Sequence, residues 1–168
     1  MSMPATPPKS GSNERRRSYG LVELKNMLDP VSSTSDRVRA LIALVGAAEL
    51  AAATSFGEGG DIKESTIRNW ANGQAEPRRN AAITIDDLRM AAKLLLDAEK
   101  TPDETRKWLL SRNEVFILHG APEDPRRPID LIRDQPTRVF REALAFAGDD
   151  FLADLLDGGP SAELSEMP

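Results

Sequence analysis

Apolar residues recur at intervals of three and four along most of the chain, as they do on one face of a helix. The spacing holds over residues 36–45, over 136–147 and over 84–98, where we expect Thr84 to open the helix. No stretch alternates apolar and polar residues as a half-buried strand would, and residues 112–128 read as a loop. The pattern therefore predicts an all-α fold.

The stretch 61–79 has the signals of one short helix. Asp61 and Glu64 have the spacing of a capping box, so we expect the helix to start there. Gly73 is a stop signal, and Pro77 prevents an early restart. One face of the helix should then be buried, namely the face that carries Ile67, Trp70 and Ala71.

The polar residues of this stretch are candidates for DNA contacts. A helix with arginine and asparagine on its exposed face suits the major groove, where Arg reads guanine and Asn reads adenine. Arginines just beyond the helix are typical phosphate contacts. The alternative is an ordinary surface helix, because every amphipathic helix has a polar face. The candidate DNA-binding residues are Lys63, Glu64, Ser65, Arg68, Asn69, Arg78 and Arg79.

Composition narrows the classes of function. The 168 residues include no cysteine and one histidine, His119, which excludes disulfides and thiolate zinc sites and argues against histidine-based catalysis. We expect no metal, no cofactor and no enzymatic activity. No apolar run reaches the ~18–20 residues of a membrane span, and the N-terminus lacks the apolar core of a secretory signal. We therefore expect a cytoplasmic protein without membrane contact.

Charge is distributed unevenly along the chain. The net charge is −5, no Lys or Arg follows Arg141, and residues 15–17 form a basic run. Such asymmetry indicates a DNA-facing part and a separate acidic part, or two solvated tails. We interpret residues 1–19 as a disordered basic arm and residues 158–168 as a disordered acidic tail.

Several motifs follow one another in an order typical of one family. The chain carries L-V-G-A-A-E-L-A-A-A-T, a glycine-containing spacer and S-T-I-R-N-W-A-N-G-Q-A-E-P-R, and then T-R-K-W-L-L-S-R-N-E, R-R-P-I-D-L-I-R-D and V-F-R-E-A-L-A-F-A-G-D. The first group resembles the Xre-type helix-turn-helix of bacterial antitoxins, and the second resembles the toxin-binding domain of the same MbcA/ParS/Xre class. The resemblance covers about residues 38–150, and residues 117–124 lengthen the usual link within the second group.

The resemblance implies an architecture and a function. It implies a helix-turn-helix DNA-binding domain over residues 20–99 and a helical toxin-binding domain over residues 100–157. Members of this class repress their own operon by binding its double-stranded promoter DNA. They also neutralise a cognate toxin, commonly a RES-domain enzyme that degrades NAD, and they are usually homodimers. The antitoxin of such a type II toxin–antitoxin system is not an enzyme.

The candidate toxin-binding residues are of two kinds. Two arginines before Pro128 can pair with an acidic partner surface, or they can lie in a solvated loop. Leucines near the C-terminus have helical spacing beside acidic residues, so they can dock on a toxin or on the chain's own core. The candidates are Arg126, Arg127, Phe151, Leu152, Leu155 and Leu156.

Two further functions stay open. A protein-binding adaptor that has lost DNA binding is favoured by the net acidity and by Glu64, because a carboxylate near phosphates is costly unless it accepts from cytosine. A stand-alone helix-turn-helix transcriptional repressor would use its C-terminal half only to dimerise. A reading frame for a RES-type enzyme beside this gene would favour the antitoxin.

Overall fold

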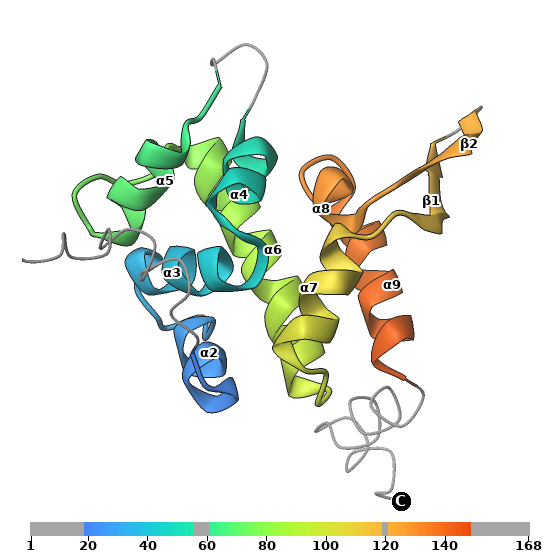
Figure 1. Ribbon diagram of the computed structural model, residues 1–168, viewed down its shortest axis with the longest axis horizontal. Coiled ribbons are helices and arrows are strands. Elements are labelled where there is room, and N and C mark those ends of the chain that lie inside the picture. Colours follow the sequence, from blue (N-terminus) through green and yellow to red (C-terminus); the bar gives the residue numbers. More distant parts are fainter. Residues whose placement is uncertain (1–18, 56–60, 119–120, 149–168) are drawn as a thin grey trace, which may run out of the picture.

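The structure, a computed structural model, describes residues 19–55, 61–118 and 121–148, and these residues are mostly helical (Figure 1). The helical character predicted from the sequence is thus confirmed. Labelled as in Figure 1, the elements are α2 (Leu21–Met27), α3 (Thr34–Val45), α4 (Ala47–Thr54), α5 (Glu64–Ala71), α6 (Arg79–Asp97), α7 (Pro102–Leu110), β1 (Asn113–Leu118), β2 (Ala121–Arg126), α8 (Pro128–Leu131) and α9 (Pro136–Ala147).

A β-hairpin departs from the all-helical prediction. The residues expected to form a loop instead pair as antiparallel strands β1 and β2. The register shifts between Asn113 and Ile117 and again between Ile117 and Leu118, so the sequence shows no regular alternation. Strand β2 also contains Pro122 and Pro125, which cannot donate to a ladder and belong on edge strands. The prediction of a loop was wrong because the apolar run is short and its partner is rich in proline.

The start of α6 lies earlier than predicted. The helix begins at Arg79 rather than at Thr84. Pro77 delays the helix by only two residues, because Ala81 already packs into the core and favours helix over coil. Residues 79–83, which precede the predicted start, are therefore helical.

The long helix α6 is central to the fold (Figure 1). It packs against α2, α3, α4, α7 and α9. The buried apolar residues form one cluster that extends from α2 to α9. The two halves that the sequence divided near residue 99 therefore share a core.

The helix α7 begins with a capping box, whose Thr101-Pro102-Asp103-Glu104 pattern can be recognised in the sequence, and it buries a tryptophan. Thr101 accepts from the Glu104 N–H at 3.0 Å, and the Glu104 carboxylate accepts from the Thr101 N–H at 3.1 Å. This backbone hydrogen bond holds the pKa of Glu104 below its usual value. Trp108 is buried, stacks on Phe146 with ring centroids 5.9 Å apart, and meets Phe116 edge-on at 6.2 Å. Aromatic packing thus joins α7 to α9 and to β1.

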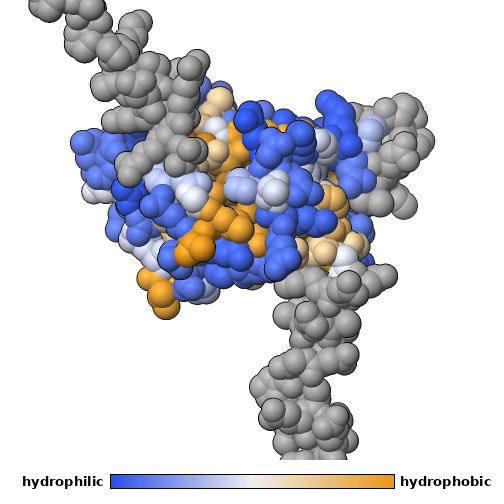
Figure 2. Space-filling view, turned by 60° about the horizontal axis from the view of Figure 1, so that its bottom comes forward, coloured by the Kyte–Doolittle hydropathy of each residue, from blue (hydrophilic) through white to orange (hydrophobic). Residues whose placement is uncertain are grey.

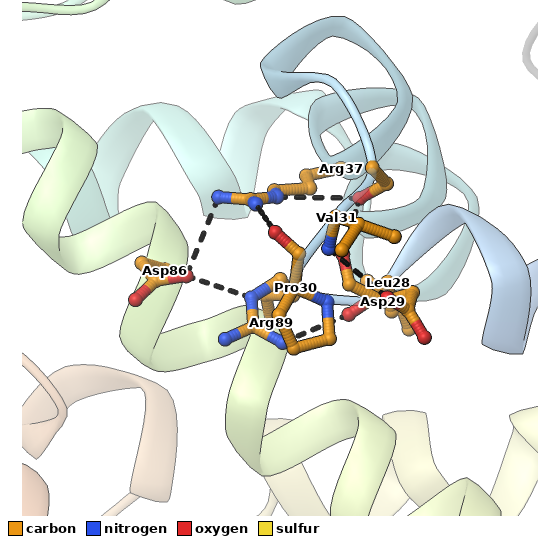
Figure 3. Close-up of polar contacts among 8 residues, drawn as sticks. Leu28, Asp29, Pro30, Val31, Arg37, Asp86 and Arg89 are labelled. Carbon is orange, nitrogen blue, oxygen red and sulfur yellow. Dashed lines mark hydrogen bonds and ion pairs between the residues drawn. The ribbon is translucent and has the colours of Figure 1, made fainter.

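A polar network fixes the loop between α2 and α3 to α6 (Figure 3). Arg89 donates from Nε to Asp86 at 2.7 Å and from Nη1 to the Leu28 carbonyl at 2.9 Å. Arg37 of α3 contacts the same carboxylate at 3.4 Å and donates to the Pro30 carbonyl. Because two guanidinium groups share one carboxylate and each satisfies a loop carbonyl, the loop is tied to α3 and α6 together.

Some apolar side chains remain at the surface, and Figure 2 shows them as a band and as separate patches between hydrophilic areas. Val22 and Val31 are the most exposed of them, at 71% and 92%. The others are Leu21, Ile83, Met90 and Phe146. No helix in the described ranges is long and apolar enough to cross a bilayer.

Candidate nucleic-acid interface

The helix α5 is held against α3 and α4 along one face. Ile67, Trp70 and Ala71 are buried, as their spacing predicted, and Trp70 is only 5% exposed. The Ser35 hydroxyl of α3 donates to the Ala71 carbonyl. Packing along α5 and a hydrogen bond at its last turn therefore fix the orientation of its other face.

The start of α5 differs from the prediction. The helix begins at Glu64, Lys63 is its N-cap, and no side chain caps its first turn. The predicted capping box between Asp61 and Glu64 is thus wrong. Its place is taken by a longer-range contact, because the Ile62 N–H donates to the Ser55 hydroxyl at 2.8 Å and holds the entering chain.

The end of α5 matches the prediction. Gly73 has φ +73°, which favours glycine, and its N–H donates to the Trp70 carbonyl at 3.2 Å. The Gln74 N–H donates to the Asn69 carbonyl at 2.9 Å. These two bonds are a Schellman ending, so the chain leaves α5 in a defined direction.

The predicted DNA-binding residues all reach the surface. Four of the five at the start of α5 and along it are exposed, and Arg68 is half-buried. The other two are exposed at the N-terminus of α6, where no side chain caps the first turn. The seven residues are Lys63, Glu64, Ser65, Arg68, Asn69, Arg78 and Arg79.

Arg68 is paired within its own helix. Its Nη2 lies 3.3 Å from the Glu64 carboxylate, one turn earlier, and both side chains are more than a third exposed. An exposed pair of this spacing contributes only about 0.3–0.5 kcal/mol. Arg68 can therefore leave Glu64 for a stronger acceptor at little cost.

The connection between α4 and α5 is fixed by Ser55. Its hydroxyl donates to the Ala51 carbonyl at 2.8 Å and accepts from the Ile62 N–H. Residues 56–60 between these points are outside the described residues. Ser55 and Ile62, on the two sides of these residues, are therefore joined by one hydrogen bond.

Of the predicted toxin-binding arginines, Arg126 ends β2 and Arg127 is the N-cap of α8, where it already has partners within the chain. Its guanidinium donates to both carboxylate oxygens of Glu49, at 3.1 and 2.9 Å, and to Asp130 at 2.8 and 2.9 Å. Hydrogen bonds to Asp130 and then to Glu49 raise the pKa of Arg127 further above its usual value. Arg126 is half-buried at the end of β2. Arg127 is thus not a solvated loop residue. It could bind a toxin only by giving up its hydrogen bonds to Glu49 and Asp130.

The apolar part of the predicted toxin-binding set lies beyond α9. Phe151, Leu152, Leu155 and Leu156 are outside the described residues, so their docking stays a prediction.

Three residues that hold α4 and its connection to α5 in place were missed by reasoning from the sequence. Ser55, Glu49 and Arg133 all make contacts that connect α4 to distant segments. A serine next to a glycine-rich spacer is a weak signal for a loop-closing hydroxyl. No sequence pattern indicates a pairing between residues 78 positions apart, as for Glu49 and Arg127.

In the part of the chain that the structure describes, no three His, Asp or Glu side chains are grouped so that they could hold a metal ion. Comparisons with models of protein families, with curated proteins and with solved structures found no match.

Proposed function

We propose that the chain is a DNA-binding repressor that uses α4 and α5 as a helix-turn-helix. One observation carries the proposal: α5 is a short helix fixed by its buried face, and it presents Arg68 and Asn69 outward with Arg78 and Arg79 just beyond it. Arginine and asparagine on such a helix can read base edges, while the flanking arginines contact phosphates. The DNA target is the chain's own promoter.

We further propose that this repressor is the antitoxin of a type II toxin–antitoxin system. The resemblance of residues 38–150 to the MbcA/ParS/Xre class supports this step. In that function, a homodimer neutralises a RES-type toxin that degrades NAD, and α7 to α9 with the segment beyond them contact the toxin. The antitoxin has no catalytic role of its own.

Replacing Arg68 with alanine should weaken binding to the promoter by about 1–3 kcal/mol and relax sequence preference at one base pair. The reason is that one bidentate base contact would be lost. Gel shifts or fluorescence anisotropy on the promoter and on single-base variants would measure both effects. Arg79→Ala is the matched control: it should weaken all sequences alike and reduce the salt slope by about one unit.

Promoter binding by the wild-type protein decides between the repressor and a protein-binding adaptor that has lost DNA binding. The adaptor is favoured by the pairing of Arg68 with Glu64, which places a carboxylate on the same face. If the protein binds no promoter DNA even at low salt, the repressor proposal fails and the adaptor takes its place. If Arg68→Ala and Arg79→Ala lose affinity equally for all sequences, α5 does not read bases.

Truncation after Gly148 should separate the two activities. It removes Phe151 to Leu156 and the acidic residues around them but leaves the described core intact. We expect the truncated protein to bind its promoter with unchanged affinity and to lose neutralisation of a RES-type enzyme encoded beside it. Growth of cells that express both proteins would measure neutralisation. Full rescue by the truncated protein would place inhibition in the segment from Trp108 to Phe140 instead.

A further inference from the structure

The helix α8 lies beside α4 (Figure 1), and the arginines that flank α8 contact both ends of α4. Arg127, just before α8, binds the Glu49 carboxylate in the first turn of α4 with two parallel hydrogen bonds of 3.1 and 2.9 Å. Arg133, just after α8, donates from Nη1 to the Ser55 carbonyl at 2.6 Å, and Ser55 caps the other end of α4. Two arginines from the C-terminal half therefore hold one short helix at its two ends.

The contact of Arg133 lies at the junction with α5. The same Ser55 that accepts from Arg133 through its carbonyl accepts from the Ile62 N–H through its hydroxyl. Ile62 precedes the first residue of α5 by two positions. The position of Arg133 is thus linked through a single residue to the point where the chain enters α5.

The hydrogen bonds of Arg127 fix the orientation of its guanidinium relative to the Glu49 carboxylate as well as the distance between the two groups. A guanidinium that binds a carboxylate through two parallel bonds is held in one plane. Asp130 accepts from the Nε and the Nη2 of the same side chain, so the fork cannot rotate away from Glu49 without losing further bonds. The pair is partly exposed, so its contribution to overall stability is small and its main effect is geometric.

We infer that Arg127 and Arg133 are positioning residues for DNA reading: they set the placement of α4, and through Ser55 the placement of α5. This inference rests on the proposed function, in which α5 reads base edges. Base readout needs donors placed to within a fraction of an ångström, whereas phosphate attraction does not. Loss of these contacts should therefore reduce binding to the promoter more than binding to unrelated DNA.

The substitution Glu49→Gln tests the inference by the sign of its effect. Removing a carboxylate makes the protein less acidic, so electrostatics alone predicts tighter binding to every duplex. Positioning predicts instead that the ratio of promoter affinity to scrambled-duplex affinity falls, by roughly 2–30-fold. Glu23→Gln, at an exposed position of α2, is the matched control and should leave the ratio unchanged. An unchanged ratio in Glu49→Gln as well would overturn the inference.

A second set of variants, matched in charge, tests the role of Arg133. Arg133→Gln and Arg141→Gln each remove one positive charge, and Arg141 is exposed on α9. We expect both to lose the same affinity for scrambled DNA, while only Arg133→Gln lowers the ratio. Arg133→Lys keeps the charge and a donor for the Ser55 carbonyl, so its ratio of promoter affinity to scrambled-duplex affinity should be close to that of the wild-type protein. Melting temperatures close to that of the wild-type protein would show that the loss does not come from partial unfolding.

Amide hydrogen exchange gives a readout that needs no DNA. In Arg133→Gln the Ile62 amide and those of α5 should exchange faster than in the wild-type protein, while the Val139 amide of α9 should not change. Equal exchange in Arg133→Gln and Arg141→Gln would overturn the inference. A wild-type protein that binds no DNA would instead overturn the proposed function, and the exchange result alone would then decide whether Arg133 positions α5.

Discussion

Replacing Trp70 with alanine should lower the free energy of unfolding by about 3–5 kcal/mol. The indole is 5% exposed, lies in the same core cluster as Ile67 and Leu41, and provides much of the apolar area that seats α5 on α3 and α4. Alanine would leave a cavity, because helices held at their other contacts cannot collapse to fill it. The free energy of unfolding of ordinary domains is only about 5–15 kcal/mol, so this loss should bring the protein close to unfolding at 37 °C.

Urea unfolding followed by circular dichroism would measure the loss. Val22→Ala is the matched control, since Val22 is 71% exposed on α2 and its truncation should change stability by less than about 0.5 kcal/mol. The loss of unfolding free energy in Trp70→Phe should lie between those of Trp70→Ala and Val22→Ala, because phenylalanine keeps an aromatic ring in the site. If Trp70→Ala retains both the midpoint and the helicity of the wild-type protein, α5 is held by something other than this side chain.

The buried face of α5 could be predicted from the sequence because the signals for it are local. Ile67, Trp70 and Ala71 have helical spacing, and Gly73 stops the helix by a conformation that glycine adopts without strain. The cap of α7 at Thr101 is local in the same way. In each case, the residues that interact lie within five positions of one another.

The parts that could not be predicted depend on distant residues. Ser55 replaces the expected cap of α5 by accepting from Ile62, seven residues away, and Arg127 pairs with Glu49 across 78 residues. The hairpin was missed because a strand is defined by its partner, and here the partner carries two prolines and an irregular register. For the candidate site, the sequence indicated which side chains face outward, but not what holds the helix that carries them.

Replacing Asp86 with asparagine should destabilise the protein by removing the carboxylate that Arg37 and Arg89 share (Figure 3). The Arg89 side chain is only 7% exposed, so its charge would lose its hydrogen-bonded carboxylate in a poorly solvated position, where Asp87 still attracts it. Breaking a fully buried pair costs about 3–5 kcal/mol; because the Asp86 side chain is itself 45% exposed, we expect about 2–3 kcal/mol. The α2–α3 loop should also loosen, because both arginines hold its carbonyls.

Asp97 supplies the matched control, because it also lies on α6 between two cations. Lys93 and Lys25 approach it at 2.9 and 3.9 Å, and the Asp97 side chain is 39% exposed, much as Asp86 is. Neither lysine is buried as Arg89 is, so Asp97→Asn should cost less than about 1 kcal/mol. The double substitution Asp86→Asn with Arg89→Met should cost less than the sum of the single ones, since it also removes the unpaired buried charge. Equal losses in Asp86→Asn and Asp97→Asn, measured by urea unfolding, would mean that the network is an ordinary surface cluster and that packing alone holds the loop.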